Sequence, residues 1–377
     1  MRKMRKIAIN TGGGDAPGLN AVIRAATLAA INHGFEVWGI RHGYRGLLEP
    51  EPGGLVRLDR DAVSGIGHLG GTILGTVNRG DPFHYPTKTD GGEKLVAVDR
   101  ADELVARFKE LGFEALIAVG GDGSQKIASK LMERGLPRVI GVPKTIDNDV
   151  IGTEVTFGFD TAVSIATEAI DRLHTTAESH ERVMVIEVMG RNAGWIALRS
   201  GLAGGADVIL IPEIPFRYEP IVAKIAQRDG RGRRFTLVVV AEGAASRGGA
   251  IAVKDKGDEL RGAPILGGIA AQVEKELAKR TDKEIRSISL GHLLRGGGPT
   301  TFDRQLALRF GAAAVRFLTD TDRSGVVAIR ADTIELCDFA TVTSGTKSVP
   351  PDSDTVKTAR SIGICFGDEP PEQFFAL

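Results

Sequence analysis

Residues 10–26 read NTGGGDAPGLNAVIRAA. A short apolar run over residues 6–10 leads into this stretch, three glycines follow it, and a helical pattern begins at Leu19. A strand, a glycine turn and a helix in this order leave free backbone N–H groups that suit phosphate. The turn lacks the G-K-[ST] of a Walker A loop and the strict G-x-G-x-x-G spacing. A phosphate-binding turn is one interpretation, and a tight strand–helix connection is the other.

The alternation of strand and helix continues along the chain. Strands that are apolar throughout, separated by helices, indicate parallel sheets covered on both faces. With 377 residues, the chain has room for about two domains. We expect an α/β protein of two doubly wound domains, with ligands at the carboxyl ends of the strands. Strands are predicted over residues 6–10, 35–40, 115–119, 139–142, 182–187, 208–211, 235–241 and 284–290, and helices over 19–33, 104–111, 124–133, 160–176, 193–203 and 265–280.

Composition narrows the class of protein. Lys plus Arg and Asp plus Glu are 48 each, so no global charge points to nucleic acid or a membrane surface. The two cysteines, Cys337 and Cys365, argue against a disulfide framework or a cysteine zinc site. No secretory segment and no apolar run of membrane length is visible. We expect a cytoplasmic protein.

A second glycine turn carries an acidic residue. Residues 118–131 read AVGGDGSQKIASKL, with Asp122 inside the turn. An aspartate beside a phosphate-binding backbone is repulsive unless a cation lies between them, and Mg²⁺ is the usual bridge. The alternative is that Asp122 caps the following helix.

Two further aspartates follow the next strand. Residues 143–150 read PKTIDNDV. One carboxylate, Asp147 or Asp149, could accept the proton of an attacking hydroxyl. The other could bind a metal or keep the first carboxylate in place. Lys144 would meet a phosphate donor. A D-N-D turn by itself is more often a solvated loop or an Asx-turn. Its place after a strand, beside two phosphate loops, favours the catalytic interpretation.

A basic group lies in the second half of the chain. SHERVMVIEVMGRNAGW (179–195) contains Arg182 and Arg191, and EIRSISLGHLLRGGGPTTFDR (284–304) contains Arg286, His292 and Arg295. Arginines after apolar strands suit a phosphorylated substrate, which they bind through forked contacts. For each residue alone, a solvated arginine or a structural histidine is the simpler interpretation.

Taken together, these motifs resemble a known family. TGGGDAPGLNAVIR, GGTILGT, GGDGS, PKTIDNDVIGT, FGFDTA, VMGRNAGW, AEG and LGHLLRGG occur in the order and at roughly the spacing of the 6-phosphofructokinases, over about residues 4 to 320. The resemblance implies phosphorylation of fructose 6-phosphate at its 1-hydroxyl, with Mg²⁺ and either ATP or, in some branches, pyrophosphate. It also implies a donor-phosphate, nucleotide and Mg²⁺ domain of residues 1–150 plus part of about 295–377, and a sugar-phosphate domain of residues 151–295.

Roles follow from the resemblance. Asp147 looks like the base, Asp149 its acidic neighbour near the reacting groups, and Asp122 the Mg²⁺ ligand. Arg79 is the candidate for the transition-state arginine, about one residue out of register. Arg182 and Arg286 match arginines donated by a neighbouring subunit, which implies a homotetramer or homodimer with shared sites. Gly13, Gly121, Gly123, Ser124 and Lys144 resemble the donor-phosphate site, with Tyr44 near the nucleotide, and Thr145, Met189, Gly190, Arg191, Glu242, His292 and Arg295 resemble the sugar-phosphate site, where Thr145 and Arg191 also serve the reaction.

The phosphate donor depends on two positions. Pyrophosphate-using members of the family commonly have an aspartate at position 123, where it fills the space of the ATP α-phosphate, and Gly123 leaves this space open. Lys144 occurs in pyrophosphate users and in some ATP-using branches. We expect ATP, with pyrophosphate as the alternative. A dinucleotide-dependent oxidoreductase does not explain Asp122 or the D-N-D loop. A non-catalytic sugar-phosphate or nucleotide sensor is the remaining rival.

Overall fold

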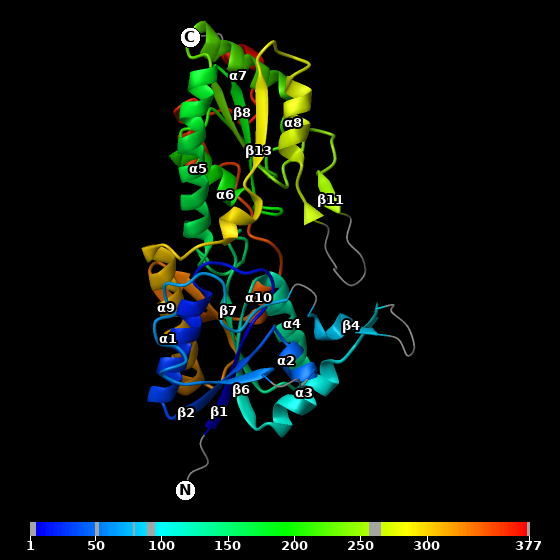
Figure 1. Cartoon of the computed structure of the whole chain (residues 1–377), viewed down its shortest axis with the longest axis vertical. Coiled ribbons are helices and arrows are strands. Elements are labelled where there is room, and N and C mark those ends of the chain that lie inside the picture. The colour runs from blue at the N-terminus through cyan, green and yellow to red at the C-terminus, as the bar shows by residue number, and fades with distance from the viewer. Residues whose placement is uncertain (1–4, 50–52, 78–79, 89–94, 256–264, 375–377) are drawn as a thin grey trace.

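The computed structural model describes residues 5–49, 53–77, 80–88, 95–255 and 265–374. Figure 1 shows two halves stacked end to end, with β1 in the lower half and β8 and β13 in the upper half. Each half is built around its own sheet and helices. The expected α/β architecture with mostly parallel sheets is confirmed.

The first sheet has seven strands in the order β15-β14-β7-β6-β1-β2-β3. The central pairs are parallel, and the two edge strands β15 and β3 pair antiparallel. The bounds are β1 (Arg5–Thr11), β2 (Phe35–Ile40), β3 (Leu55–Leu58), β6 (Phe113–Gly120), β7 (Arg138–Pro143), β14 (Gly325–Arg330) and β15 (Thr333–Cys337).

Both faces of this sheet are covered, which explains why its strands are apolar throughout. Ile7 and Ile9 of β1 belong to the core under α1 (Leu19–Asn32) and α9 (Thr301–Asp320). Ala8, between them, belongs to the opposite core, under α3 (Ala101–Glu110) and α4 (Asp122–Glu133). Successive side chains of a strand point to opposite faces, so a strand buried on both faces has no polar alternation.

The second sheet has four parallel strands in the order β13-β8-β10-β9. Helices α5 (Phe159–His180) and α6 (Trp195–Ala203) cover one face, and α7 (Tyr218–Gly230) and α8 (Ile269–Leu277) cover the other. The strands are β8 (Val183–Val188), β9 (Val208–Leu210), β10 (Thr236–Ala241) and β13 (Ile285–Ser289).

The C-terminal part of the chain serves both halves. Strands β14 and β15 extend the first sheet, and α10 (Phe339–Val342) packs beside it. Val349, Val356 and Phe366 then join the core of the second sheet, and this stretch contains α11 (Asp354–Ser361) and the 3₁₀ turn η3 (Pro371–Phe374). Part of residues 295–377 thus extends the first sheet, and the rest packs on the second. We propose a first domain of about residues 5–150 and 295–345, and a second of about 151–295 and 346–374.

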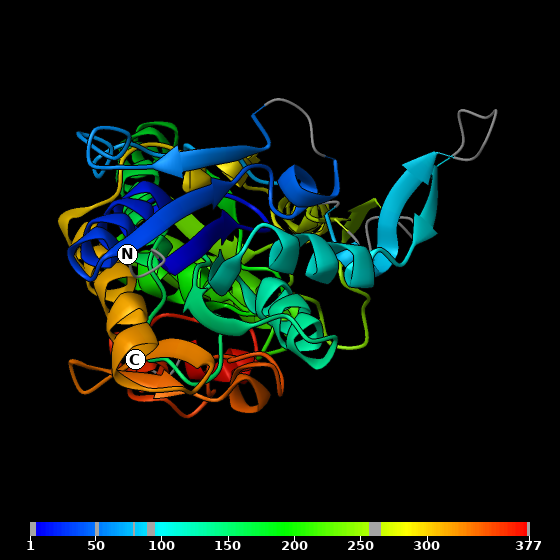
Figure 2. The same ribbon diagram turned by 90° about the horizontal axis from the view of Figure 1, so that it is seen from below.

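Local differences from the sequence expectation have a backbone cause. The predicted helix over 265–280 begins only at Ile269, because β12 (Ile265–Leu266) pairs with β11 (Val253–Asp255). Gly267 and Gly268 lie between β12 and α8, with φ of 128° and 93°. This conformation ends the strand, and glycine adopts it without strain. A second hairpin, β4 (Tyr85–Lys88) with β5 (Leu95–Val98), projects from the body in Figure 2.

Short elements complete the fold, namely α2 (Arg45–Leu48) and the 3₁₀ turns η1 (Pro82–His84) and η2 (Gly291–Arg295). Within the described ranges, no helix combines the length and the apolar character that crossing a membrane requires.

Candidate active site

Three neighbouring parallel strands, β1, β6 and β7, end at one edge of the first sheet. Backbone hydrogen bonds continue past the strand ends. The Gly12 N–H donates to the carbonyl of Val119 over 2.9 Å, and the Lys144 N–H donates to the carbonyl of Gly120 over 3.0 Å. The three segments singled out from the sequence, residues 12–14, 121–124 and 144–149, are therefore adjacent.

The residues expected at the donor phosphate come together at this edge. Gly13 has φ of 73°, and a Cβ at this position would lie 3.6 Å from Ser124 Oγ and 3.7 Å from Lys144 Nζ. The Lys144 ammonium donates to the carbonyl of Gly14. A backbone turn thus lies against a hydroxyl and a buried cation, a combination suited to phosphate oxygens.

Asp122 opens helix α4 instead of capping it. Gly121 is the cap residue, and no side-chain hydrogen bond caps this helix among the described residues. The Asp122 carboxylate forms an ion pair with Lys126 over 3.3 Å. The capping alternative does not describe this residue. Asp122 is partly accessible and Gly123, beside it, is exposed.

The D-N-D loop is buried, unlike a solvated loop. Asp147 is 3% and Asp149 is 8% exposed. Thr145 Oγ1 accepts the Asp147 N–H over 3.0 Å. Asn148 has φ of 52°, and its Oδ1 accepts the Thr156 N–H over 3.2 Å. Asparagine tolerates this left-handed conformation better than most residues, so it can hold two aspartates in a tight turn.

Burial dominates the protonation of this loop. It raises the pKa of Asp147, while the cations Arg295, Arg191 and Lys144 act to lower it. Burial, and after it the charges of Asp147 and Asp122, raise the pKa of Asp149 to about 6. Within the described chain, Asp147 Oδ1 is buried and has no hydrogen-bond partner. A buried carboxylate oxygen without a donor is suited to accept the hydrogen of a substrate hydroxyl.

Lys144 has the opposite shift. Burial, and then the Arg295 cation, lower its pKa to about 8, while the nearby carboxylates oppose this change. Lys144 therefore remains mostly charged at neutral pH and can balance phosphate charge.

The second sheet supplies the other side of the site. Met189, Gly190 and Arg191 follow β8, and Glu242 follows β10, its parallel neighbour. Glu242 Oε1 accepts the Arg191 N–H over 3.0 Å. Gly190 has φ of 147°, and a Cβ there would lie 2.5 Å from the carbonyl oxygen of Ala193. Only glycine permits this close turn.

The third strand of this edge, β13, leads into η2, which carries His292 and Arg295. Arg295 Nη1 donates to the carbonyl of Asp15 over 2.9 Å. His292 is exposed and lines a cavity of about 750 Å³ together with Ser289 and Leu293. The bond from Arg295 to Asp15 joins the loops at the ends of the two sheets, so they face each other. The charges of Arg295, Arg191 and Glu242 act on Asp147 there.

Three expected residues lie outside this cluster. Arg182 and Arg286 both pair with Glu284, over 2.7 and 2.5 Å, beside the start of β8. Met189 follows the other end of β8, about 20 Å away at 3.3 Å per residue. Tyr44 is 6% exposed in the core, and burial raises its pKa. Arg79 lies outside the described residues.

The sequence interpretation missed one residue at the D-N-D loop. Lys347 Nζ donates to Asn148 Oδ1 over 3.0 Å across 199 residues of chain. Lys347 lies in no glycine turn and follows no strand of the sheets, so no local pattern marks it.

The carboxylates fit Mg²⁺ by their chemistry. Asp122, Asp147 and Asp149 are hard oxygen donors, and the first two raise the pKa of the third, which shows that negative charge is concentrated here. In the described part of the chain, no group of three His, Cys, Asp or Glu side chains could hold a metal by itself. A Mg²⁺ here would therefore take further ligands from phosphate and water.

The first sheet ends in a loop with carboxylates, and the second sheet ends in loops with arginines that face it. In two doubly wound domains, this arrangement defines a phosphotransferase-type site. Residues 6–318 match the model of the family described as "Phosphofructokinase". The chain is a member of this family.

Relatives with curated names share nearly the whole chain. "ATP-dependent 6-phosphofructokinase 2" of Clostridium perfringens is 49% identical over 370 residues, 98% of this chain and 100% of the relative. "ATP-dependent 6-phosphofructokinase" of Chloroflexus aurantiacus is 50% identical over 368 residues, which cover 97% of this chain and 99% of the relative. "Pyrophosphate--fructose 6-phosphate 1-phosphotransferase" of Amycolatopsis methanolica is 48% identical over 348 residues, 92% and 97%.

A solved structure has the same fold. The Pichia pastoris phosphofructokinase in the T-state matches with a TM-score of 0.75 and 32% identity over 96% of this chain. This chain spans 37% of the length of that yeast chain.

Proposed function

We propose that this protein transfers the γ-phosphoryl group of ATP to the 1-hydroxyl of fructose 6-phosphate, with Mg²⁺, to give fructose 1,6-bisphosphate. The observation that carries the proposal is the buried Asp147. Its Oδ1 has no hydrogen-bond partner among the described residues, and cations from the loops of both sheets act on its carboxylate. The family and the named ATP-dependent relatives support the same reaction.

The proton and the phosphoryl group move in opposite directions. Asp147 accepts the proton of the 1-hydroxyl while the hydroxyl oxygen bonds to the γ-phosphorus, and the bond to the β–γ bridging oxygen breaks to release ADP. Thr145 holds the Asp147 N–H and so fixes the base. Mg²⁺, when bound near Asp122 and Asp149, neutralises charge on the phosphates.

Other residues bind and orient the two substrates. The proposed donor-phosphate site consists of Gly13, Gly121, Gly123, Ser124 and Lys144. We assign Tyr44 to the neighbourhood of the nucleotide and Arg79 as a transition-state arginine. On the sugar side we assign Thr145, Met189, Gly190, Arg191, Glu242, His292 and Arg295. Positioning and charge neutralisation are what phosphoryl transfer requires of a protein.

Arg182 and Arg286 serve the sugar phosphate of a neighbouring subunit in this proposal. About one strand length separates them from the site of their own chain, and both are at least partly accessible beside Glu284. Arginines at that place can reach a second copy more easily than their own site. We therefore propose a homo-oligomer with shared active sites, and the cytoplasm as its location.

Pyrophosphate is the second candidate donor, because one relative at 48% identity is named a pyrophosphate enzyme. Two features favour ATP. The space beside Gly123 is open, with nothing of the described chain within 4 Å of a Cβ there, and the two other relatives are named ATP-dependent.

The deciding experiment offers fructose 6-phosphate and Mg²⁺ to the purified protein with ATP or with pyrophosphate and measures fructose 1,6-bisphosphate. We expect product with ATP. Product with pyrophosphate alone would show that pyrophosphate, and not ATP, is the donor. No product with either donor would support a non-catalytic sensor instead.

A further inference from the structure

The C-terminal strap, which we define as residues 345–374, lies beyond residues 6–318 that the family model matches. The strap runs along the active-site loops before it packs on the second sheet. Its contacts assign it a role in the proposed reaction.

Lys347 binds the D-N-D loop at several points. Its ammonium donates to Asn148 Oδ1 over 3.0 Å and to the carbonyls of Thr153 and Glu154 over 3.0 and 2.9 Å. Its own N–H donates to the carbonyl of Asp149 over 2.8 Å. One residue thus holds both ends of the segment from Asn148 to Glu154.

The Asn148 contact is the most telling of these. The left-handed turn at Asn148 separates the two aspartates. Asn148 Oδ1 accepts from both Lys347 Nζ and the Thr156 N–H. A charged donor forms a stronger hydrogen bond than a neutral one, so the ammonium holds this turn more firmly than an amide or hydroxyl would.

The same stretch of the strap also binds the loop that carries Arg191. Trp195 Nε1 donates to the carbonyl of Lys347 over 2.9 Å. Two residues further, the Val349 N–H donates to Glu213 Oε1 over 2.8 Å, and the same oxygen accepts the Gly194 N–H over 3.0 Å. The strap therefore joins the base loop of the first sheet to the arginine loop of the second.

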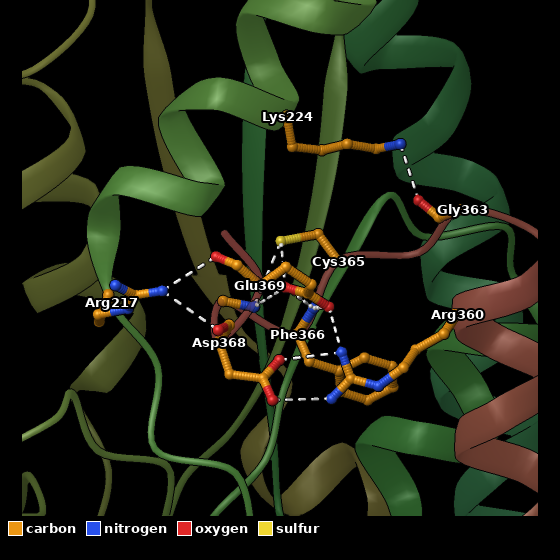
Figure 3. Close-up of polar contacts among 9 residues, drawn as sticks. Arg217, Lys224, Arg360, Gly363, Cys365, Phe366, Asp368 and Glu369 are labelled. Atoms are coloured by element: carbon orange, nitrogen blue, oxygen red, sulfur yellow. Dashed lines mark hydrogen bonds and ion pairs between the residues drawn. The ribbon is translucent and has the colours of Figure 1, made fainter. Parts of the chain in front are cut away.

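The distal end of the strap is fastened by a cluster of polar contacts (Figure 3). Arg360 forms a two-bond pair with Asp368, 2.9 Å each, and also contacts the buried Glu369. Arg217 donates to the carbonyls of Asp368 and Glu369, and Lys224 donates to the carbonyl of Gly363 over 2.8 Å. These contacts tie the distal end of the strap to α7 and to Arg217, which precedes this helix.

We propose that Lys347 is a positioning residue for phosphoryl transfer, holding Asp147 and Asp149 in place relative to Arg191 by means of the strap. The proposal rests on the proposed function for its chemistry. Lys347 itself need not touch substrate. A loop displaced by about 1 Å can slow an enzyme about a hundredfold, which gives a positioning contact its weight.

The charge of the ammonium has a further effect. Burial lowers the pKa of Lys347 to about 8, opposed by the carboxylates of Asp149 and Glu154. The lysine is thus mostly protonated at pH 7 and balances charge beside the loop.

The test compares Lys347→Ala with Lys224→Ala. Lys347, within the strap, donates to carbonyls of the segment that follows the D-N-D loop. Lys224, in α7, donates to the carbonyl of Gly363 at the distal end of the strap. We expect Lys347→Ala to lower kcat by about tenfold to a hundredfold with KM changed by less than about threefold, because an interaction that aligns the reacting groups is lost. Lys224→Ala should leave kcat within about twofold of wild type even where its melting temperature falls.

Chemical rescue separates positioning from general stability. Lys347 lines a cavity of about 450 Å³ with Thr153, Glu154 and Arg330, so a small alkylammonium ion has a place to bind once the side chain is shortened. Added ethylammonium should raise kcat of Lys347→Ala in a saturable way and leave Lys224→Ala unchanged. Equal losses of kcat in the two variants, or no rescue, would overturn the proposal.

Amide hydrogen exchange decides the structural part without any assay of activity. Peptides spanning residues 145–156 should exchange about tenfold faster in Lys347→Ala than in Lys224→Ala, since hydrogen bonds to a charged donor are lost. Unchanged exchange would overturn the proposal even in an active enzyme. A wild-type protein that fails to phosphorylate fructose 6-phosphate would overturn the proposed function, while the exchange result would still decide whether Lys347 orders the loop.

Discussion

Arg295 donates a hydrogen bond of 2.9 Å to the backbone carbonyl of Asp15, across 280 residues of sequence. The bond joins η2, after the second sheet, to the glycine turn after β1 of the first sheet. It places a guanidinium where it acts on Asp147 and on Lys144. The two halves of the chain therefore share one electrostatic environment, and changes at either edge should be felt at the base.

Replacing the proposed base tests this arrangement first. We expect Asp147→Asn to lower kcat by about 10²- to 10⁴-fold, the usual contribution of a general base. The same change should raise the melting temperature at pH 7. Burial raises the pKa of Asp147 above its unfolded value, so its ionised form is less favourable in the folded chain than in the unfolded one.

The measurements are steady-state kinetics and thermal unfolding of the same preparations. The exposed Asp61→Asn serves as the control and should change neither property. Near-normal turnover in Asp147→Asn would refute the assignment of Asp147 as the base. A lower melting temperature would refute the prediction that burying the ionised Asp147 destabilises the folded chain.

The pH profile provides a second test. The pKa of Asp149 is raised to about 6 and that of Lys144 is lowered to about 8. As the pH falls through about 6, Asp149 gains a proton and loses the charge that balances metal and arginines. As the pH rises through about 8, Lys144 loses the proton that balances phosphate. We expect kcat/KM for the donor to be bell-shaped, with limbs near these two values, because this parameter reports the free enzyme.

Lys144→Met assigns the alkaline limb. The variant should have a lower kcat/KM for the donor, and its limb near pH 8 should be weaker, since Lys347, whose pKa is also lowered to about 8, still loses its proton there. An alkaline limb that persists unchanged in Lys144→Met would show that another group causes it.

The sequence predicted the edges of the sheets better than the contacts between them. Apolar strands and glycine turns are local patterns, so β1, β6, β7, β8 and β10 could be placed within one or two residues. The helix predicted from residue 265 was wrong at its start, because the pairing of β12 with β11 is a tertiary contact that overrides helical pattern.

Long-range contacts explain what the sequence did not show. Lys347 contacts Asn148 from the far end of the chain. The strap packs on the second sheet, but no strand pattern or glycine motif in its sequence predicts this contact. Burial of Asp147 and Asp149 likewise depends on covering segments remote in sequence. The residue types of the site were visible in the sequence, but their protonation and support were not.

Shared active sites predict that two impaired variants can complement each other when fructose 6-phosphate is well below the KM of Arg286→Ala. Asp147→Asn lacks the base, and Arg286→Ala lacks the arginine proposed to serve the neighbouring subunit. In a hybrid, the intact base of one chain meets the intact arginine of the other. Random mixing into dimers should restore about a quarter of the wild-type sites.

The variants are mixed, unfolded and refolded together, and activity is compared with each variant treated alone. Arg286→Ala alone should chiefly raise KM for fructose 6-phosphate, because a charged contact to its phosphate is lost. A mixture no more active than the average of its parts would show that Arg286 does not act across subunits.

The donor preference should depend on position 123. Gly123 is the second residue of α4, and the described chain places nothing within 4 Å of a Cβ there. Gly123→Asp should therefore fold well, since an acidic side chain is favourable in the first turn of a helix. Its charge would repel the ATP α-phosphate, so we expect the ratio of kcat/KM for ATP over pyrophosphate to fall by about tenfold to a thousandfold. Gly123→Ala adds the Cβ without the charge and should keep most of the ATP activity. Similar losses in both variants would indicate that the backbone freedom of Gly123, and not its open space, serves ATP.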